Sequence, residues 1–294
     1  MNAIPIAYPT DWTEYELIDS GDGEKLERFG PDAASGYTLI RPDPRALWQK
    51  NNPALWETAD ASFKRTDPKT GQWIVNNPPP SVWTVAYHEL KFTLRPTEFK
   101  HVGVFPEQAV NWNWIKEQVN EKPLNILNLF AYTGGATMAA ASAGAKVTHV
   151  DAVKSTLTWA HENVTASGLA DKPIRWIEDD AYKFVTREAK RGNYYDGIIL
   201  DPPRFGRGTK GEVWKLEDDL PKMVSAIKQI LSPNPTFVLI NAYTADISSI
   251  VLLNLLNDLM KNYKGNLTFG ELALKESHSD RLLPNGIFVR WANA

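Results

Sequence analysis

Short apolar runs alternate with helix-forming segments over the last two thirds of the chain. The apolar runs have the composition of buried parallel strands, and the segments between them repeat apolar residues with helical spacing. This alternation predicts an α/β fold in which an open, doubly wound sheet carries helices on both faces. The predicted strands are 124–130, 146–151, 174–178, 195–201, 236–241, 267–274 and 287–291, and the predicted helices are 110–119, 136–143, 154–167, 181–191, 212–231 and 247–263.

The first hundred residues follow a different pattern. Short β-favouring pieces such as 37–40, 72–75 and 90–94 are separated there by turn-forming glycine, proline, asparagine and aspartate residues. We therefore expect a smaller, mainly β N-terminal domain over residues 1–102 and the α/β domain over residues 103–294. A chain of 294 residues is long enough to build both cores.

Composition excludes several kinds of site. The chain has no cysteine, which removes disulfides, thiolate metal sites and cysteine nucleophiles, and its five histidines lack metal-ligand spacing, so we expect no metal. It shows neither a signal-peptide pattern nor a long apolar run, which predicts a cytoplasmic protein without a membrane segment. The net charge of −3 gives no general attraction to nucleic acid, so an RNA-binding surface would have to be a local patch. The oligomeric state stays open.

A glycine pair follows the first predicted strand. In an open parallel sheet the ligand binds beyond the carboxyl ends of the strands, so the residues just after each strand are the candidates. Gly134 and Gly135 permit a tight turn and the close approach of a ligand to the backbone. The third glycine of the spacing G-x-G-x-x-G is missing, which argues against a nicotinamide-dependent oxidoreductase and predicts an adenosine ligand without phosphates.

Acidic residues follow the second and third predicted strands. Asp151 ends the second strand, where a carboxylate can accept hydrogen bonds from ribose hydroxyls. Asp180, after the third strand, offers a carboxylate to an adenine amino group. Each residue has an alternative role as the N-cap of the helix that follows.

The fourth predicted strand ends in Asp201-Pro-Pro-Arg-Phe205. The two prolines hold the backbone extended and withhold two N–H donors, so the neighbouring carbonyl groups are presented as acceptors. An attacking amine needs such acceptors. The alternative is a rigid exit from the strand that has no part in the chemistry.

The motifs at 128–135, 150–151, 180–181 and 201–205 together resemble the S-adenosylmethionine (SAM)-dependent methyltransferase family that includes the bacterial large-subunit ribosomal RNA methyltransferases. The resemblance implies a class I methyltransferase fold with a Rossmann-like, seven-stranded sheet, SAM as the methyl donor and an RNA substrate, as in ribosomal RNA processing. For Asn163 the alternative is a helix-surface asparagine. The cofactor contacts that the resemblance implies are Gln108, Phe130, Tyr132, Thr133, Gly134, Asp151, Asn163, Asp180, Ala181 and Asp201.

The motif at 201–205 and the resemblance together predict the acceptor, which we expect to be a nitrogen of an RNA base. Members of the family that methylate C5 of cytosine need a cysteine, and where that branch carries it this chain has Asn241. The expected catalytic residues are Asp201, Pro202, Pro203 and Phe205, and the expected substrate contacts are Arg204, Phe205, Arg207 and Lys210.

Several alternatives stay open at this point. The acceptor could instead be a small molecule or a protein, or the chain could be a non-catalytic RNA-binding protein that keeps the fold. The basic cluster could be a solvated loop, because Glu212 and Glu217 lie close to it in the sequence. The segment 280–286 could be a loop over the active site or a hairpin.

Overall fold

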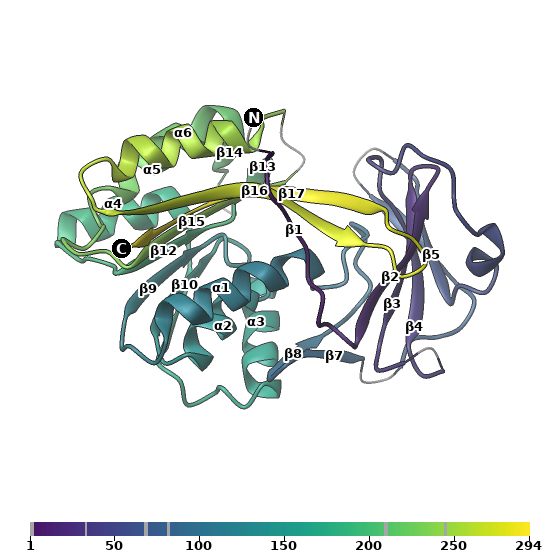
Figure 1. Cartoon of the computed structure of the whole chain (residues 1–294). Coiled ribbons are helices and arrows are strands. Elements are labelled where there is room, and N and C mark those ends of the chain that lie inside the picture. Colours follow the sequence, from purple (N-terminus) through teal and green to yellow (C-terminus); the bar gives the residue numbers. More distant parts are fainter. Residues whose placement is uncertain (1–2, 33, 68–69, 81–82, 209–210, 244–245) are drawn as a thin grey trace. The chain divides into compact units, whose positions relative to one another are not determined.

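The computed structural model describes residues 3–32, 34–67, 70–80, 83–208, 211–243 and 246–294 (Figure 1). The chain forms two compact units. One is an α/β unit made of the N-terminal residues up to Ala7, Val110–Leu272 and Asn285–Ala294; the other is a β-rich unit made of Tyr8–Ala109 and Ala273–Pro284. The sequence boundary after residue 102 stays a prediction, and the structure adds that each unit is built from more than one stretch of chain.

The α/β unit contains an eight-stranded sheet in the order β1-β16-β17-β15-β12-β9-β10-β11. Five consecutive strands, β11, β10, β9, β12 and β15, run parallel to one another, and β17 runs antiparallel to β15. The seven strands predicted from the sequence are all present, and the short β1 adds an eighth beside β16. The bounds are β1 (Ile6–Ala7), β9 (Asn125–Leu129), β10 (Lys146–Asp151), β11 (Ile174–Glu178), β12 (Gly197–Leu200), β15 (Phe237–Ala242), β16 (Gly265–Lys275) and β17 (Leu282–Asn293).

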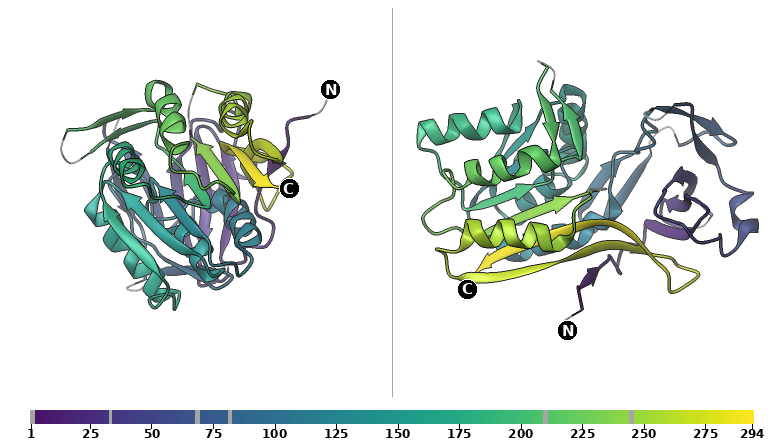
Figure 2. Two further views of the ribbon diagram at one scale, coloured as in Figure 1. Left: turned by 90° about the vertical axis from the view of Figure 1, so that its left-hand side faces the viewer. Right: turned by 90° about the horizontal axis from the view of Figure 1, so that it is seen from above.

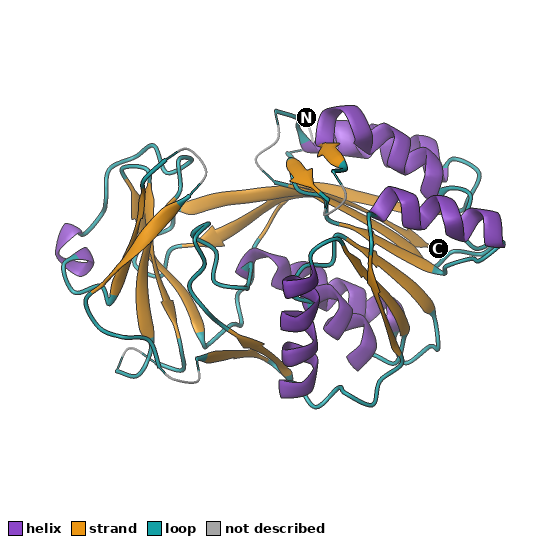
Figure 3. Cartoon of the chain, turned by 180° about the vertical axis from the view of Figure 1, so that it is seen from behind, coloured by secondary structure: helices purple, strands orange, loops and turns teal. Residues whose placement is uncertain are grey.

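Helices cover both faces of this sheet (Figure 3). Alternate side chains of the strands point to opposite faces, so Leu127 of β9 packs with α4, α5 and α6, whereas Ile126 packs with α1 and α2. Full burial of a side chain of this size contributes about 1.5–3 kcal/mol. The α-helices among the described residues are α1 (Ala109–Val119), α2 (Gly135–Ser142), α3 (Lys154–Ala166), α4 (Ala181–Arg191), α5 (Leu216–Ile227) and α6 (Ser249–Met260).

The strand order places a switch point in the middle of the sheet. The chain passes from β9 outward through β10 and β11, and then returns to the other side of β9 to form β12 and β15. In sheets of this kind a ligand binds at the carboxyl ends of the strands that flank the reversal. The α/β class and the doubly wound, Rossmann-like sheet predicted from the sequence are confirmed, and the sheet can be followed from two further sides in Figure 2.

The structure differs from the sequence prediction at 212–231. The first part of this segment is a strand, β14 (Val213–Lys215), which pairs with β13 (Phe205–Arg207) in a hairpin before α5 begins at Leu216. Exposure alternates along β14, since Trp214 is buried between two exposed neighbours. That period of two belongs to a strand, and a helical pattern starts only after it.

The predicted segment 280–286 lies at the start of β17. A hydrogen bond from the backbone N–H of Glu276 to the carbonyl of Arg281 (3.0 Å) closes the turn between β16 and β17. Residues from Leu282 onward are already part of the strand. The segment is therefore the end of a turn and the beginning of a strand.

The β-rich unit contains a five-stranded sheet, in the order β2-β3-β4-β5-β6, and a separate hairpin of β7 and β8. Aromatic side chains fill much of its interior; the ring centroids of Trp12 and Tyr87 are 4.8 Å apart. Burial raises the pKa of Glu27, but the charges of Arg41 and Lys25 outweigh it and lower the pKa to about 2. The strands are β2 (Tyr15–Gly21), β3 (Glu24–Phe29), β4 (Tyr37–Pro42), β5 (Ala61–Arg65), β6 (Gly71–Val75), β7 (Thr84–Tyr87) and β8 (Leu90–Thr93).

Candidate functional site

The carboxyl ends of four neighbouring strands lie at the same level. Leu129 of β9 is the register partner of both Val150 of β10 and Leu200 of β12, and Val150 is in turn the partner of Ile177 of β11. Adjacent strands are about 4.8 Å apart. The loops that follow these strands, at 130–134, 151–153, 179–181 and 201–205, therefore start side by side along one edge of the sheet.

Backbone hydrogen bonds hold these loops against one another. The N–H of Ala131 donates to the carbonyl of Val150 (3.1 Å), and the N–H of Asp179 donates to the carbonyl of Asp151 (3.1 Å). A longer bond of 3.4 Å joins the N–H of Asp201 to the carbonyl of Leu129. The three predicted motifs after β9, β10 and β12 are thus brought together by the sheet itself.

The turn after β9 has an unusual backbone. Phe130 and Tyr132 have φ of 57° and 49°, and Gly134, at the start of α2, has φ of 88°. Positive φ is uncommon for residues other than glycine, and it costs energy that surrounding contacts must offset. We name residues 130–134 the cofactor turn.

The two glycines allow close packing within the protein. A Cβ atom on Gly135 would lie 2.6 Å from Cζ2 of Trp112 in α1, and one on Gly134 would lie 3.2 Å from Cβ of Ala160 in α3. The tight turn predicted from the glycine pair is present. Its second consequence, which the sequence did not indicate, is that the indole of Trp112 packs directly on the first turn of α2.

Asp151 binds the cofactor turn to β10. Its Oδ2 accepts a hydrogen bond from the backbone N–H of Tyr132 (2.9 Å), and its Oδ1 accepts one from that of Val153 (3.0 Å). The N-cap position of α3 is occupied by Val153, so Asp151 is not the cap of that helix. Burial raises the pKa of the Asp151 carboxyl, although these backbone bonds act in the opposite direction. A carboxylate oxygen can accept more than one hydrogen bond, so this group fits a ribose hydroxyl.

Asp180 takes the capping role that was its alternative. Its Oδ1 accepts a hydrogen bond from the backbone N–H of Lys183 (2.8 Å), which makes it the N-cap of α4. Ala181, the first residue of α4, is buried beside it. Capping uses one carboxylate oxygen, and contact of Asp180 and Ala181 with adenine stays a prediction.

Asn163 is not a surface residue. It is 0% exposed, and its Nδ2 donates to the carbonyl of Thr133 in the cofactor turn (2.9 Å). Thr133 is itself buried. Asn163 therefore holds the turn in place, while direct contact of Asn163 or Thr133 with a cofactor stays a prediction.

A buried polar chain lies below the turn, and sequence reasoning missed it. Asn128 Nδ2 donates to Thr137 Oγ1 (2.9 Å), and Thr137 Oγ1 lies 2.9 Å from Nδ1 of His149. Burial lowers the pKa of His149 to about 3, so the ring is neutral at physiological pH. Asn128 and His149 are register partners on β9 and β10. The available signal was therefore two polar residues at matching positions in adjacent apolar strands.

The segment 201–205, named here the acceptor loop, is fixed by the β13–β14 hairpin. Trp214 Nε1 donates to the carbonyl of Pro203 (2.8 Å), and the N–H of Leu216 donates to the carbonyl of Arg204 (2.9 Å). Asp201 is half-buried and Pro202 is buried, whereas Phe205 is 50% exposed. The carbonyl of Pro203 is thus engaged within the protein.

The predicted substrate contacts are only partly clear of intramolecular partners. Arg204 makes ion pairs with Glu217 (Nε to Oε1, 3.5 Å) and with Asp246, so its charge is largely compensated. The guanidinium of Arg207 lies 5.9 Å from the ring centroid of Phe205. Lys210 lies outside the described residues. Phosphate contact by these side chains and stacking by Phe205 stay predictions.

Gln108 and Asn241 lie near the ends of other elements. Gln108 is buried in a 3₁₀ helix (Pro106–Gln108) at the end of the β-rich unit, and its cofactor contact stays a prediction. Asn241 is buried near the carboxyl end of β15, where its Oδ1 accepts a hydrogen bond from Nδ2 of Asn111 (2.9 Å). Oδ1 of Asn111 in turn accepts from Nε of Arg290 (2.9 Å). Asn241 therefore belongs to a buried polar network.

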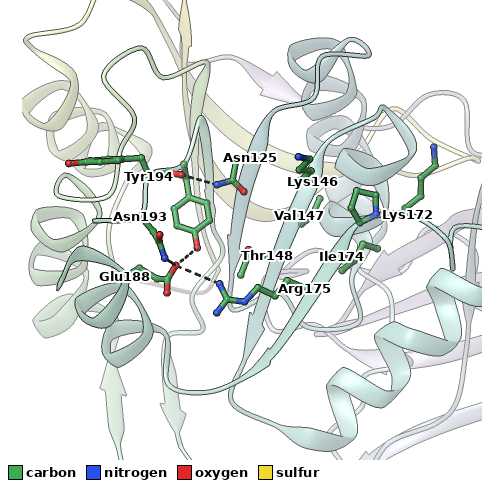
Figure 4. A pocket seen from close by; sticks show the side chains of 12 residues that line it. Asn125, Lys146, Val147, Thr148, Lys172, Ile174, Arg175, Glu188, Asn193 and Tyr194 are labelled. Carbon is green, nitrogen blue, oxygen red and sulfur yellow. Dashed lines mark hydrogen bonds and ion pairs between the residues drawn. The ribbon is translucent and has the colours of Figure 1, made fainter. Parts of the chain in front are cut away.

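A hollow of about 520 Å³ lies at the opposite edge of the sheet (Figure 4). It is lined by the first residues of β9, β10 and β11, among them Asn125 and Lys146. The carboxylate of Glu188 accepts hydrogen bonds there from Tyr195 Oη and Asn193 Nδ2 (both 2.8 Å). This hollow is at the amino ends of the strands, so it contains none of the predicted cofactor or catalytic residues.

Two features are absent from the described part of the chain. No helix there is long and apolar enough to cross a membrane. No group of three or more His, Cys, Asp or Glu side chains among the same residues is arranged to hold a metal ion.

Comparison with known proteins matches residues 60–256 to the model of a family described as S-adenosylmethionine-dependent methyltransferase. Over its whole length the chain is similar to a crystal structure of the SAM-dependent methyltransferase from Agrobacterium tumefaciens, with 41% identity, 95% of that chain covered and a TM-score of 0.92. SMU.776, solved in complex with S-adenosylhomocysteine (SAH), shares the fold at 17% identity and a TM-score of 0.74, over 96% of this chain and 76% of that one.

Curated relatives carry a more specific name. The chain is 32% identical over 153 residues to ribosomal RNA large subunit methyltransferase K/L of Shewanella frigidimarina (strain NCIMB 400), which is 51% of this chain. It spans 21% of the length of that relative. The family match covers more than half of the chain, and the carboxyl-edge geometry agrees with it. The chain therefore belongs to the S-adenosylmethionine-dependent methyltransferases, and SAM is its cofactor.

Proposed function

We propose that this methyltransferase transfers the methyl group of SAM to a nitrogen of an RNA base. The observation that carries the proposal is the acceptor loop, which starts from the strand next to the cofactor turn and contains Asp201 followed by two prolines. The name of the curated relatives, ribosomal RNA large subunit methyltransferase K/L, supports an RNA acceptor. The chain spans about a fifth of the length of these relatives, so the RNA substrate is proposed for this chain and is not inferred from their activity.

The carboxyl edge of the sheet fits the cofactor. SAM supplies an activated methyl group on a sulfonium centre. Asp151 would accept hydrogen bonds from the ribose hydroxyls, and Asp180 would accept one from the adenine amino group through the carboxylate oxygen that does not cap α4. The cofactor turn, held by Asp151 and Asn163, would then lie along the rest of the ligand.

The acceptor loop would orient the nucleophile. The carbonyl of Pro203 already accepts a hydrogen bond from Trp214. The amine would therefore be recognised by the carbonyl of Pro202 and the carboxylate of Asp201. SAM would supply the methyl group to the amine nitrogen and be released as SAH, and Asp201 would accept the proton that the amine loses. Holding the two reactants in line can supply about 7–11 kcal/mol of the barrier.

Phe205 and Arg207 would bind the rest of the substrate. The ring of Phe205 is half exposed at the base of the β13–β14 hairpin, which suits stacking on a flat base. Arg207 lies beside that ring and would meet a phosphate. Arg204 would do so less readily, because Glu217 and Asp246 already bind it.

The test is transfer of a labelled methyl group from SAM to three pools: total RNA, total protein and small metabolites. We expect label in RNA, and after digestion to nucleosides we expect it on a base nitrogen. Asp201→Ala is the negative control, and Asp171→Ala, in an exposed turn before β11, is the matched surface substitution. Label on a carbon atom, or in the protein or metabolite pool alone, would contradict the proposal.

A small-molecule acceptor is the second candidate, and one observation favours it. The net charge is −3, and the acidic partners of Arg204 weaken the positive charge next to the acceptor loop. RNA binding draws most of its affinity from phosphate neutralisation, which such a surface supplies poorly. The metabolite pool of the same assay distinguishes the two acceptors.

A further inference from the structure

Trp214 lies between the two loops that carry the chemistry. It is the central residue of β14 and is 8% exposed, whereas its neighbours Val213 and Lys215 are exposed. Its ring centroid is 4.8 Å from that of Phe130 in the cofactor turn. Its Nε1 donates a hydrogen bond of 2.8 Å to the carbonyl of Pro203 in the acceptor loop. One side chain therefore touches both loops.

The contact with Phe130 supports a strained part of the backbone. Phe130 directly follows β9 and has φ of 57°, in the left-handed region that side chains other than glycine rarely adopt. Such a conformation persists only when surrounding packing fixes it. The tilted ring pair of Phe130 and Trp214 is part of that packing.

The hairpin also packs tightly on the acceptor loop. Gly206 is the register partner of Trp214, and a Cβ atom on Gly206 would lie 3.3 Å from Cγ of Pro203 and 3.7 Å from Cβ of Trp214. The N–H of Leu216, two residues after Trp214, donates to the carbonyl of Arg204. The position of the prolines is thus determined by the hairpin as well as by β12.

We propose that Trp214 is a positioning residue, which sets the distance between the acceptor loop and the cofactor turn. The inference rests on the proposed function, because it assigns the acceptor to the loop at 201–205. Trp214 acts through Pro203 and Phe130 and is not assigned to touch the reacting atoms. A displacement of about 1 Å of a positioning group can reduce a rate by about 100-fold, so the N–H bond to Pro203 is expected to influence kcat.

Trp214→Phe tests the bond to Pro203. The phenyl ring keeps an aromatic surface against Phe130 but lacks the N–H donor. We expect kcat to fall about 10- to 100-fold, while the affinity for SAH stays within about two-fold of the wild type. Trp73→Phe is the matched control, because Trp73 Nε1 also donates to a backbone carbonyl, that of Thr97, at 2.8 Å. It should leave kcat unchanged.

Gly206→Ala displaces the same loop without removing the N–H donor. The added methyl group meets Pro203 at 3.3 Å, a separation that requires the loop to move by a few tenths of an ångström. We expect a smaller loss of kcat, again with SAH affinity preserved. This variant keeps the test decisive if Trp214→Phe lowers the melting temperature.

A second readout does not depend on methyl transfer. Trypsin can cut after Arg204 and Arg207, which are both exposed and flank Phe205. If Trp214 connects the two loops, SAH should slow these cuts in the wild type and in Trp73→Phe, and should slow them much less in Trp214→Phe. SAH protection that is present in the wild type and lost in Trp214→Phe, in a protein that methylates no RNA, would overturn the proposed function and leave the role of Trp214 standing.

Two results would overturn the inference about Trp214. One is an unchanged kcat together with unchanged SAH protection in folded Trp214→Phe protein. The other is an equal fall in kcat and SAH affinity in both Trp214→Phe and Gly206→Ala, since a general loss of structure gives that pattern and a positioning role does not.

Discussion

The substitution Asn163→Asp removes a hydrogen-bond donor below the cofactor turn. In the wild type, Nδ2 of Asn163 donates to the buried carbonyl of Thr133 at 2.9 Å. Aspartate has almost the same shape but places an acceptor oxygen against that carbonyl. A buried carbonyl left without its donor costs about 1–3 kcal/mol, and the repulsion adds to this.

These energies give measurable shifts. At roughly 2–4 °C per kcal/mol for a unit of this size, the melting temperature should fall by about 2–12 °C. A turn that has moved must be restored before it can bind its ligand, and each 1.4 kcal/mol spent on that weakens SAH binding about ten-fold. Thermal unfolding and titration calorimetry with SAH measure the two effects.

The matched control is Asn254→Asp, because Asn254 is an exposed residue of α6. It should change the free energy of unfolding by about 0.5 kcal/mol or less. If Asn163→Asp unfolds and binds SAH like the wild type, then Asn163 does not hold the turn and the reasoning is refuted.

Three further changes probe other parts of the site. Burial raises the pKa of Asp151, so folding favours the protonated carboxyl group. The contribution of Asp151 to the free energy of unfolding is therefore present below the pKa of the unfolded state and is lost as the pH rises through the pKa of the folded state. In the proposed site the ionised Asp151 accepts hydrogen bonds from the ribose. As the pH is lowered, SAH affinity should therefore begin to fall at a higher pH than for an ordinary aspartate, and Asp151→Asn should lack this pH dependence in calorimetry. Asp201→Asn should lower kcat by about 10²- to 10⁴-fold in the transfer assay and keep SAH affinity; an active variant would argue against a proton acceptor at this position. Gly135→Ala should destabilise the protein by about 1–3 kcal/mol in denaturant unfolding, because the new Cβ meets Trp112 at 2.6 Å, and additivity with Trp112→Leu in a double-mutant cycle would contradict that cause.

The sequence was sufficient for the sheet and for the edge at which the motifs meet. Parallel strands share a direction, so residues after them, such as Asp151 and Asp201, must emerge at one edge once the strands are identified. Strand identity follows from apolar composition, which is a local property. This is why the seven strands could be predicted without tertiary information, whereas their order in the sheet comes from the structure.

Features that depend on tertiary contacts could not be predicted in this way. Asn163 looked equally suited to a helix surface, and only the packing of α3 below the turn buries it. The helical pattern that follows Trp214 predicts a helix there, whereas the contacts of Trp214 are with Pro203 and Phe130, which precede it in the chain. Asp180 satisfied both the capping pattern and the cofactor pattern, since the two require the same residue type at the same position.

The same limit applies to the extent of the units. Residues 273–284 belong to the β-rich unit, although the sequence suggested a single C-terminal α/β domain. The ends of β16 and β17 extend into that segment, and strand length is poorly determined by composition alone. The domain boundary predicted at residue 102 likewise marks a change of local sequence pattern, whereas the extent of each unit depends on its tertiary contacts.

Amide hydrogen exchange in the presence and absence of SAH tests the location of the cofactor most directly. We expect slower exchange in 130–134, 151–153 and 201–205, at the carboxyl ends of β9, β10 and β12. Protection confined to 193–195 and the start of β10, around the hollow at the opposite edge, would contradict the account, as would the absence of any protection in folded protein.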